Sequence, residues 1–106
     1  MKVIYTAQSL DDLKELGDWI SRDSPAQALR FVRDLRARCR GLAAYPARFP
    51  IVSERQGERV RRCVHRSYLI LFQIDAGQGV VVILRVANGV RDYNRLIGQP
   101  CKEDDD

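Results

Sequence analysis

One stretch of the chain decides its fold: residues 68–86 have the sequence YLILFQIDAGQGVVVILRV. Two runs of β-branched, aromatic and aliphatic residues, 68–74 and 80–86, flank five residues that include two glycines. This pattern is typical of a β-hairpin. Both alternating faces of the first run are apolar, so its strand is expected to be central and covered on both sides.

A third strand is expected just upstream, over residues 60–66, where the sequence is VRRCVHR. Residues 45–59 contain two prolines and a glycine and are expected to form a loop.

The N-terminal half has the spacing of a short strand followed by helices. Residues 3–5 predict an opening strand. Apolar residues at helical spacing predict a first amphipathic helix over residues 10–21, with Ser9 as its N-cap and Asp12 at the capping-box position.

A second helix is expected from Pro25, with Ser24 as its N-cap, and Pro46 is expected to stop it. The element order is therefore β-α-α-β-β-β. The economical arrangement is an α+β fold in which a two-helix hairpin packs on a small antiparallel sheet. We expect one domain over residues 1–98 and an acidic, mobile tail over residues 99–106.

The net charge of +4 is unevenly distributed along the chain. Residues 101–106 hold one lysine and four acids, so the rest of the chain carries +7. Five arginines lie within residues 30–40 and five within residues 55–66. So basic a body favours an anionic partner, either nucleic acid or an acidic protein, and a solvated basic surface is the alternative of equal weight.

The cysteines predict neither a disulfide framework nor a metal site. Cys39, Cys63 and Cys101 are far apart, and His65 is the only histidine. We expect the first two cysteines to be buried, and we expect no metal and no cofactor. The sequence has no apolar run of membrane-spanning length and no signal peptide, so a cytoplasmic location is expected.

Hydrolytic chemistry would have to use His65. Nearby arginines are expected to lower the pKa of this histidine and to keep it neutral. A lone histidine on a strand is more often structural than catalytic. The chain also has no glycine-rich phosphate loop that follows a strand and opens a helix.

The arginine-rich strand suggests phosphate chemistry or a partner surface. Arg61 and Arg62 point to opposite faces of a regular strand. Metal-free RNA cleavage needs cations around the phosphate, together with an acid and a base, for which only His65, Tyr68 and Tyr93 are candidates. We favour the structural alternative, in which Tyr68 belongs to the core and the arginines pair with an acidic partner.

The chain is expected to leave its last strand at the turn-forming pair Asn88-Gly89. Arg91-Asp92 follows directly, which predicts either a functional turn or a local salt bridge that fixes the C-terminus.

These features together resemble the ParE/RelE toxins over residues 3–97. The shared motifs are Leu10-Asp11-Asp12-Leu13, Ser24-Pro25 with Ala28, Leu42 with Pro46, Arg61-Arg62, and Arg66 with Tyr68. Most specific is VILRVANGVRD at residues 82–92, which is similar to the closing ParE signature of an Ile-Leu-Arg-Val strand and a His-Gly-x-Arg-Asp turn. Asn88 stands where ParE relatives commonly carry histidine.

The resemblance implies a type II toxin that is neutralised by a small ParD-like antitoxin in a hetero-oligomer. ParE members poison DNA gyrase, whereas RelE members cleave messenger RNA on the ribosome. Arg62 and Arg91 match positions of the RelE-type nuclease set. Leu69 falls where those nucleases carry a catalytic arginine, and Ile97 falls roughly where they end in tyrosine, which favours ParE.

Three hypotheses follow. In the first, the chain is a non-enzymatic gyrase poison that meets nucleic acid only indirectly and no membrane, with target-binding candidates Arg85, Arg91, Asp92 and Tyr93. In the second, it is a ribosome-dependent endoribonuclease that places Arg61, Arg62, Arg66 and Arg91 around the phosphate and uses Tyr93 or His65 as acid or base. In the third, it is a non-toxic relic that still binds the antitoxin. Apolar anchors in the groove between hairpin and sheet are expected to supply most of the antitoxin's affinity.

Overall fold

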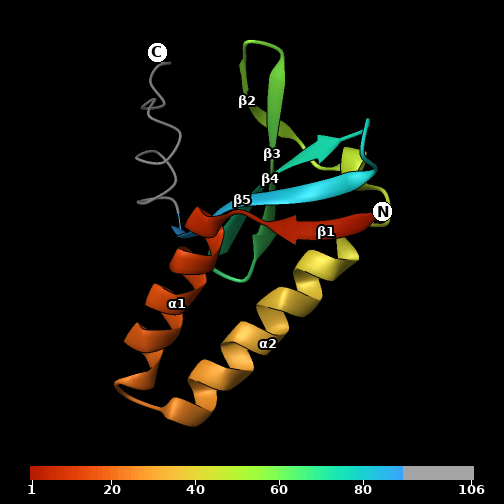
Figure 1. Cartoon of the computed structure of the whole chain (residues 1–106). Coiled ribbons are helices and arrows are strands. Elements are labelled where there is room, and N and C mark those ends of the chain that lie inside the picture. Colours follow the sequence, from red (N-terminus) through yellow and green to blue (C-terminus); the bar gives the residue numbers. More distant parts are fainter. Residues whose placement is uncertain (90–106) are drawn as a thin grey trace.

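A helical hairpin packs against one face of a five-stranded sheet in the computed structural model, which describes residues 1–89 (Figure 1). The elements in chain order are β1 (Lys2–Tyr5), α1 (Ala7–Ser21), α2 (Pro25–Gly41), a 3-10 turn (Pro46–Arg48), β2 (Ile51–Arg55), β3 (Glu58–His65), β4 (Tyr68–Asp75) and β5 (Val80–Asn88). The predicted α+β class is confirmed, with one strand more than the sequence indicated.

The strands lie in the order β1-β5-β4-β3-β2, so β4 is central, as predicted. Antiparallel pairing holds from β2 through β5. The expectation of a wholly antiparallel sheet is wrong at one edge, because β1 pairs in parallel with β5. β2, β3, β4 and β5 form a meander that begins at the edge of the sheet opposite β1. Its last strand, β5, lies beside β1 and runs in the same direction.

The predicted loop over residues 45–59 is wrong, since it contains β2 and the first residues of β3. The two strands are joined by a tight turn in which Gln56 and Gly57 both have positive φ, 56° and 83°. Two central residues of positive φ match the right-handed twist of the flanking strands. The prolines do not interrupt the sheet, because Pro50 precedes β2 and its carbonyl accepts the backbone N–H of Arg62.

The first helix begins three residues earlier than predicted, and its N-cap is Thr6. Ser9 is therefore not the cap: its backbone N–H donates to Thr6 Oγ1, and its own hydroxyl donates to the Thr6 carbonyl. The second helix follows the prediction, with Ser24 accepting the backbone N–H of Gln27 and Pro25 opening the helix.

The core lies between the hairpin and the sheet and contains both described cysteines. Leu35, Cys39 and Cys63 are at most 1% exposed and pack among apolar residues of β4 and β5. Burial raises the pKa of Cys39 to about 11 and raises that of Cys63 in the same direction. Both side chains are thus neutral thiols at physiological pH, in agreement with their predicted role as small hydrophobes.

Candidate functional site

The end of β5 is tied to α1 by a carboxylate that lies almost entirely inside the protein. Asp12 is 8% exposed and accepts hydrogen bonds from Arg85 Nε at 2.8 Å and Arg85 Nη2 at 3.0 Å. The same carboxylate accepts the backbone N–H of Val86 at 2.9 Å. The capping-box interpretation of Asp12 is therefore wrong. Asp12, Arg85 and the Val86 N–H are called the β5 brace below.

The β5 brace lies at the part of β5 that continues beyond the end of its neighbour β1. β1 accompanies β5 only as far as the pair Tyr5 and Ile83, and α1 begins two residues later. Thr6 continues the contact, since its N–H donates to the Ile83 carbonyl and its hydroxyl to the Leu84 carbonyl, both at 3.0 Å. Buried backbone polar groups need partners, and here Thr6 and Asp12 take over from a neighbouring strand.

Arg85, one of the predicted target-binding residues, thus has a structural partner. Its hydrogen bond to Asp12 is the largest cause that raises the pKa of Arg85, and 32% of its side chain remains exposed. The other three target-binding candidates, Arg91, Asp92 and Tyr93, lie outside the described residues.

Arg61 and Arg62, which are neighbours in β3, lie on opposite faces of the sheet. Arg61 pairs with the core residue Phe72 in the sheet register. Its Nη1 donates to the carbonyl oxygens of Ala47 at 3.0 Å and Phe49 at 2.7 Å. Arg62 is on the face turned away from the helices, and within residues 1–89 its buried Nε has no hydrogen-bond partner.

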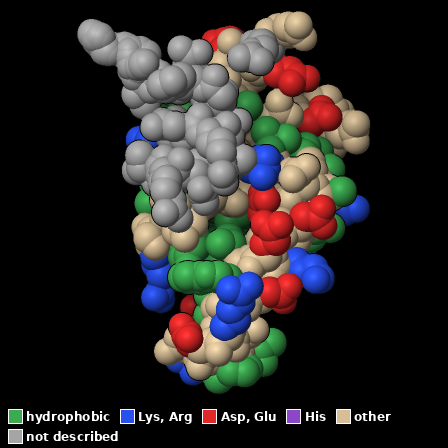
Figure 2. All heavy atoms as spheres, turned by 90° about the vertical axis from the view of Figure 1, so that its left-hand side faces the viewer, with side chains coloured by type: hydrophobic (Ala, Val, Ile, Leu, Met, Phe, Trp, Pro, Cys, Tyr) green, Lys and Arg blue, Asp and Glu red, His purple; other side chains and the backbone are tan. Residues whose placement is uncertain are grey.

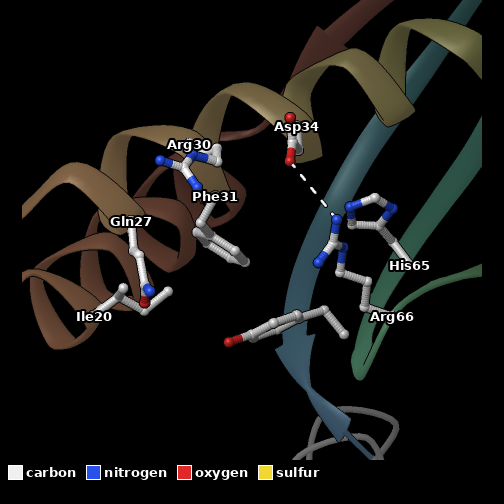
Figure 3. A pocket seen from close by; sticks show the side chains of 8 residues that line it. Ile20, Gln27, Arg30, Phe31, Asp34, His65 and Arg66 are labelled. Carbon is white, nitrogen blue, oxygen red and sulfur yellow. Dashed lines mark ion pairs between the residues drawn. The ribbon is translucent and has the colours of Figure 1, made fainter. Parts of the chain in front are cut away.

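An open cavity of about 500 Å³ lies between α2 and the β3–β4 turn (Figure 3). It is lined by Ile20, Gln27, Arg30, Phe31, Asp34, His65, Arg66 and Tyr68. The rings of Phe31 and Tyr68 are 4.7 Å apart between centroids and tilted by 55°. This hollow, called the α2 cavity, brings together the nuclease candidates His65 and Arg66 but neither Arg61 nor Arg62.

The pKa of His65 is lowered from its ordinary value, as predicted. Burial is the largest cause, followed by the charges of Arg66 and Arg38, while Asp34 acts in the opposite direction. The imidazole is therefore neutral at pH 7, with one donor nitrogen and one acceptor nitrogen.

The described part of the chain contains no cluster of three His, Cys, Asp or Glu side chains that would hold a metal ion. Among the helices of residues 1–89, none is both long and apolar enough to cross a membrane.

The comparison with known families agrees with the motifs and the geometry. A family model for the ParE toxin of the type II toxin–antitoxin system parDE matches residues 3–93. The chain belongs to this ParE toxin family. No curated protein matches the chain significantly.

Solved structures share the fold of this ParE family member. The chromosomal ParDE toxin–antitoxin system from P. aeruginosa aligns with a TM-score of 0.67 and 21% identity, over 85% of this chain and 97% of that one. The toxin–antitoxin complex RelBE2 from Mycobacterium tuberculosis gives 0.59 and 26%, over 82% and 88%. The archaeal RelE–RelB complex from Pyrococcus horikoshii OT3 gives 0.53 and 19%, over 85% and 96%.

The motifs of the ParE family located Arg85 in the sequence but not its partner Asp12, which is 73 positions away. They also missed Arg30, Phe31 and Asp34 in the α2 cavity. The one sequence signal for these three residues was the amphipathic pattern of α2, which places Phe31 on the side of the sheet. That pattern does not indicate that α2 packs near the β3–β4 turn.

Proposed function

We propose that the chain is the toxin of a type II toxin–antitoxin pair, that it poisons DNA gyrase, and that a ParD-like antitoxin neutralises it. The family match over residues 3–93 carries this proposal, because it covers the closing motif that the sequence shares with ParE toxins. The shared fold of the P. aeruginosa ParDE system supports the same assignment.

The distribution of the nuclease candidates favours a poison over an enzyme. Cleavage of RNA without a metal needs an acid, a base and cations within hydrogen-bond reach of one phosphate. Arg61 is engaged by two loop carbonyls, and Arg62 lies on the face of β3 opposite to Arg61. His65 and Arg66 line the α2 cavity. The four candidates within the described residues thus lie at three separate places, and only His65 and Arg66 lie together.

Expression of the chain without an antitoxin tests the gyrase target in cells. We expect colony counts to fall and gyrase to be recovered with covalently attached DNA. Alanine at Arg91, Asp92 or Tyr93 is expected to reduce both effects while the unfolding midpoint stays unchanged. Arg22→Ala, which removes an exposed charge on the hairpin, is the matched control. Growth arrest without covalent gyrase–DNA complexes would refute the gyrase target.

We propose the outer surface of the hairpin as the main seat of the antitoxin. An apolar hollow of about 370 Å³ between α1 and α2 is lined by Leu13, Lys14, Gly17, Asp18, Ser21, Pro25, Ala28, Leu29 and Val32. Leu29, which belongs to this lining, is an apolar side chain that is 69% exposed. Figure 2 shows hydrophobic side chains gathered on the face that includes α1, among charges of both signs. The anchors were expected instead in the groove between hairpin and sheet. The hollow is lined by two charged side chains, whereas the α2 cavity is lined by three.

Charge placed in the hollow tests that surface. Leu29→Glu is expected to weaken antitoxin binding by tenfold or more, since apolar anchors dominate the energetics of such interfaces. Ala26→Glu adds the same charge on an exposed position of α2 and is expected to have little effect. Equal losses for the two variants, measured by calorimetry with the cognate antitoxin, would exclude the hollow as the seat.

One observation favours the endoribonuclease as the second candidate: a neutral His65 stands beside Arg66, so a base and a cation share one cavity. Primer extension on messenger RNA after expression separates the two functions. Codon-specific cuts that disappear in His65→Asn would establish the nuclease. Intact messenger together with normal colony counts would identify a non-toxic antitoxin-binding relic.

A further inference from the structure

The α2 cavity is lined by two cations and two aromatic rings. Arg30 projects from α2, and Arg66 projects from the β3–β4 turn on the facing side (Figure 3). The tilted rings of Phe31 and Tyr68 belong to the same lining. A volume of about 500 Å³ is within the range of pockets that hold small molecules.

Arg66 occupies a backbone position that favours glycine. His65 pairs with Tyr68, so Arg66 and Ser67 form a two-residue turn in which Arg66 has φ = 59°. Of the two turn residues only the first, Arg66, has positive φ. Tight β-hairpin turns of this kind usually have glycine at the first position. A non-glycine residue in such a conformation costs of order 1 kcal/mol or more, and such strain is concentrated at functional positions. The strained residue is the one that sends a guanidinium into the cavity.

The charges of the cavity favour an anion. Its lining contains two arginines and one carboxylate, and His65 is neutral. The carboxylate of Asp34 approaches Arg66 Nη2 only to 4.0 Å, and their side chains are 44% and 76% exposed. An exposed pair at this distance contributes little, so a phosphate can compete for the guanidinium. Within residues 1–89, Arg30 takes part in no ion pair.

We propose that the α2 cavity binds one nucleotide of single-stranded nucleic acid. The phosphate lies between Arg30 and Arg66, the base packs against the rings of Phe31 and Tyr68, and the Gln27 amide meets the edge of the base. Aromatic faces combined with cations are the means by which proteins hold single strands without sequence readout. This site goes beyond the action on gyrase and does not depend on it.

The test is a fluorescence anisotropy titration of the full chain with a fluorescein-labelled hexaribonucleotide of mixed sequence and with its DNA counterpart. The variant Arg30→Ala/Arg66→Gly is expected to weaken binding by tenfold or more. It should also reduce the slope of log affinity against log salt by about 0.7, the value for one phosphate neutralised on a single strand. Glycine at position 66 suits the turn, so this variant keeps the fold.

The matched control is Arg33→Ala/Arg40→Ala, which removes the same charge from exposed positions of α2 outside the cavity. It is expected to weaken binding less than threefold. Asp34→Asn is expected to tighten binding, because it releases Arg66 from a competitor. Adenosine monophosphate should displace the strand if the pocket takes a free nucleotide, whereas displacement only by unlabelled hexamer places the ligand within a strand.

Equal weakening by the two double variants would show diffuse attraction and overturn the proposal, as would the absence of binding by either hexamer. Displacement of the hexamer by an acidic peptide as readily as by unlabelled hexamer would also overturn it, by assigning the cavity to a protein ligand. Because this is a direct binding measurement, its failure would leave the gyrase assay unaffected, and an inert gyrase assay would leave this result standing.

Discussion

Removing the carboxylate of the β5 brace is expected to destabilise the protein more than any other single change to an acidic side chain in α1. Asp12→Ala leaves the guanidinium of Arg85 and the N–H of Val86 without the acceptor that both use. Breaking a buried ion pair from one side costs about 3–5 kcal/mol, and an unsatisfied buried N–H about 1–3 kcal/mol.

The expected loss lies just below the summed range of about 4–8 kcal/mol, because part of the cost is relieved by water. The Arg85 side chain is 32% exposed, so its charge is partly solvated after the substitution. We expect the free energy of unfolding to fall by about 3 kcal/mol. At roughly 4–8 °C per kcal/mol for a domain of this size, the melting temperature falls by more than about 10 °C.

Urea unfolding followed by circular dichroism at pH 7 measures this loss. Asp11→Ala is the matched control, an exposed neighbour on the same helix whose replacement is expected to change stability by less than about 0.5 kcal/mol. Asp12→Ala/Arg85→Met removes the stranded charge as well, so it should be less destabilising than the sum of its parts by about 1–2 kcal/mol. If Asp12→Ala matched Asp11→Ala, the brace would have no energetic role and the structural explanation of Arg85 would fail.

Three further predictions concern His65, the two buried cysteines and two glycines. The pKa of His65 is lower in the folded state, so the unfolded chain binds more protons below about pH 6.5. The free energy of unfolding should therefore fall as pH drops through that window, and less so in His65→Asn; equal slopes in urea titrations would contradict this. Cys39 and Cys63 should resist iodoacetamide at pH 8 until urea is added, as mapped by mass spectrometry; native-state labelling would refute their burial. Gly89→Ala should cost more stability than Gly79→Ala in thermal melts, because both glycines have positive φ but only at Gly89 would a Cβ meet a backbone oxygen, Ser67 O at 3.4 Å; equal costs would contradict it.

The helical hairpin and the three longest strands could be predicted because their periodicity is local. Ser24 and Pro25 mark the start of α2 by chemistry that acts within one turn. The edge strand β2 was missed because it follows two prolines and turns at Gln56-Gly57, which lacks the usual asparagine or aspartate before the glycine. The prolines and glycine of residues 45–59 usually indicate a loop, so the pairing of β2 with β3 was not predicted.

The candidate site was predictable only in part, because its decisive contacts join residues far apart in the chain. The spacing of Asp12 from Ser9 suggested a capping box, which is a contact within one helical turn. Such local patterns cannot predict that Asp12 accepts hydrogen bonds from Arg85 and Val86, which are 73 and 74 positions away. The α2 cavity likewise depends on which turn α2 meets. Arg66 was recognised as a cation, but neither its positive φ nor its place in one cavity with Arg30 follows from the sequence.

The gyrase cleavage reaction tests the central claim most directly. Purified chain is incubated with DNA gyrase, ATP and supercoiled plasmid, the reaction is quenched with detergent and protease, and linear DNA is measured against a quinolone control. The proposed function predicts linear plasmid that increases with the concentration of the chain and disappears when the cognate antitoxin is added in equimolar amount. Plasmid without added breaks, in a reaction where the quinolone does produce linear DNA, would contradict the claim that this ParE family member is a gyrase poison.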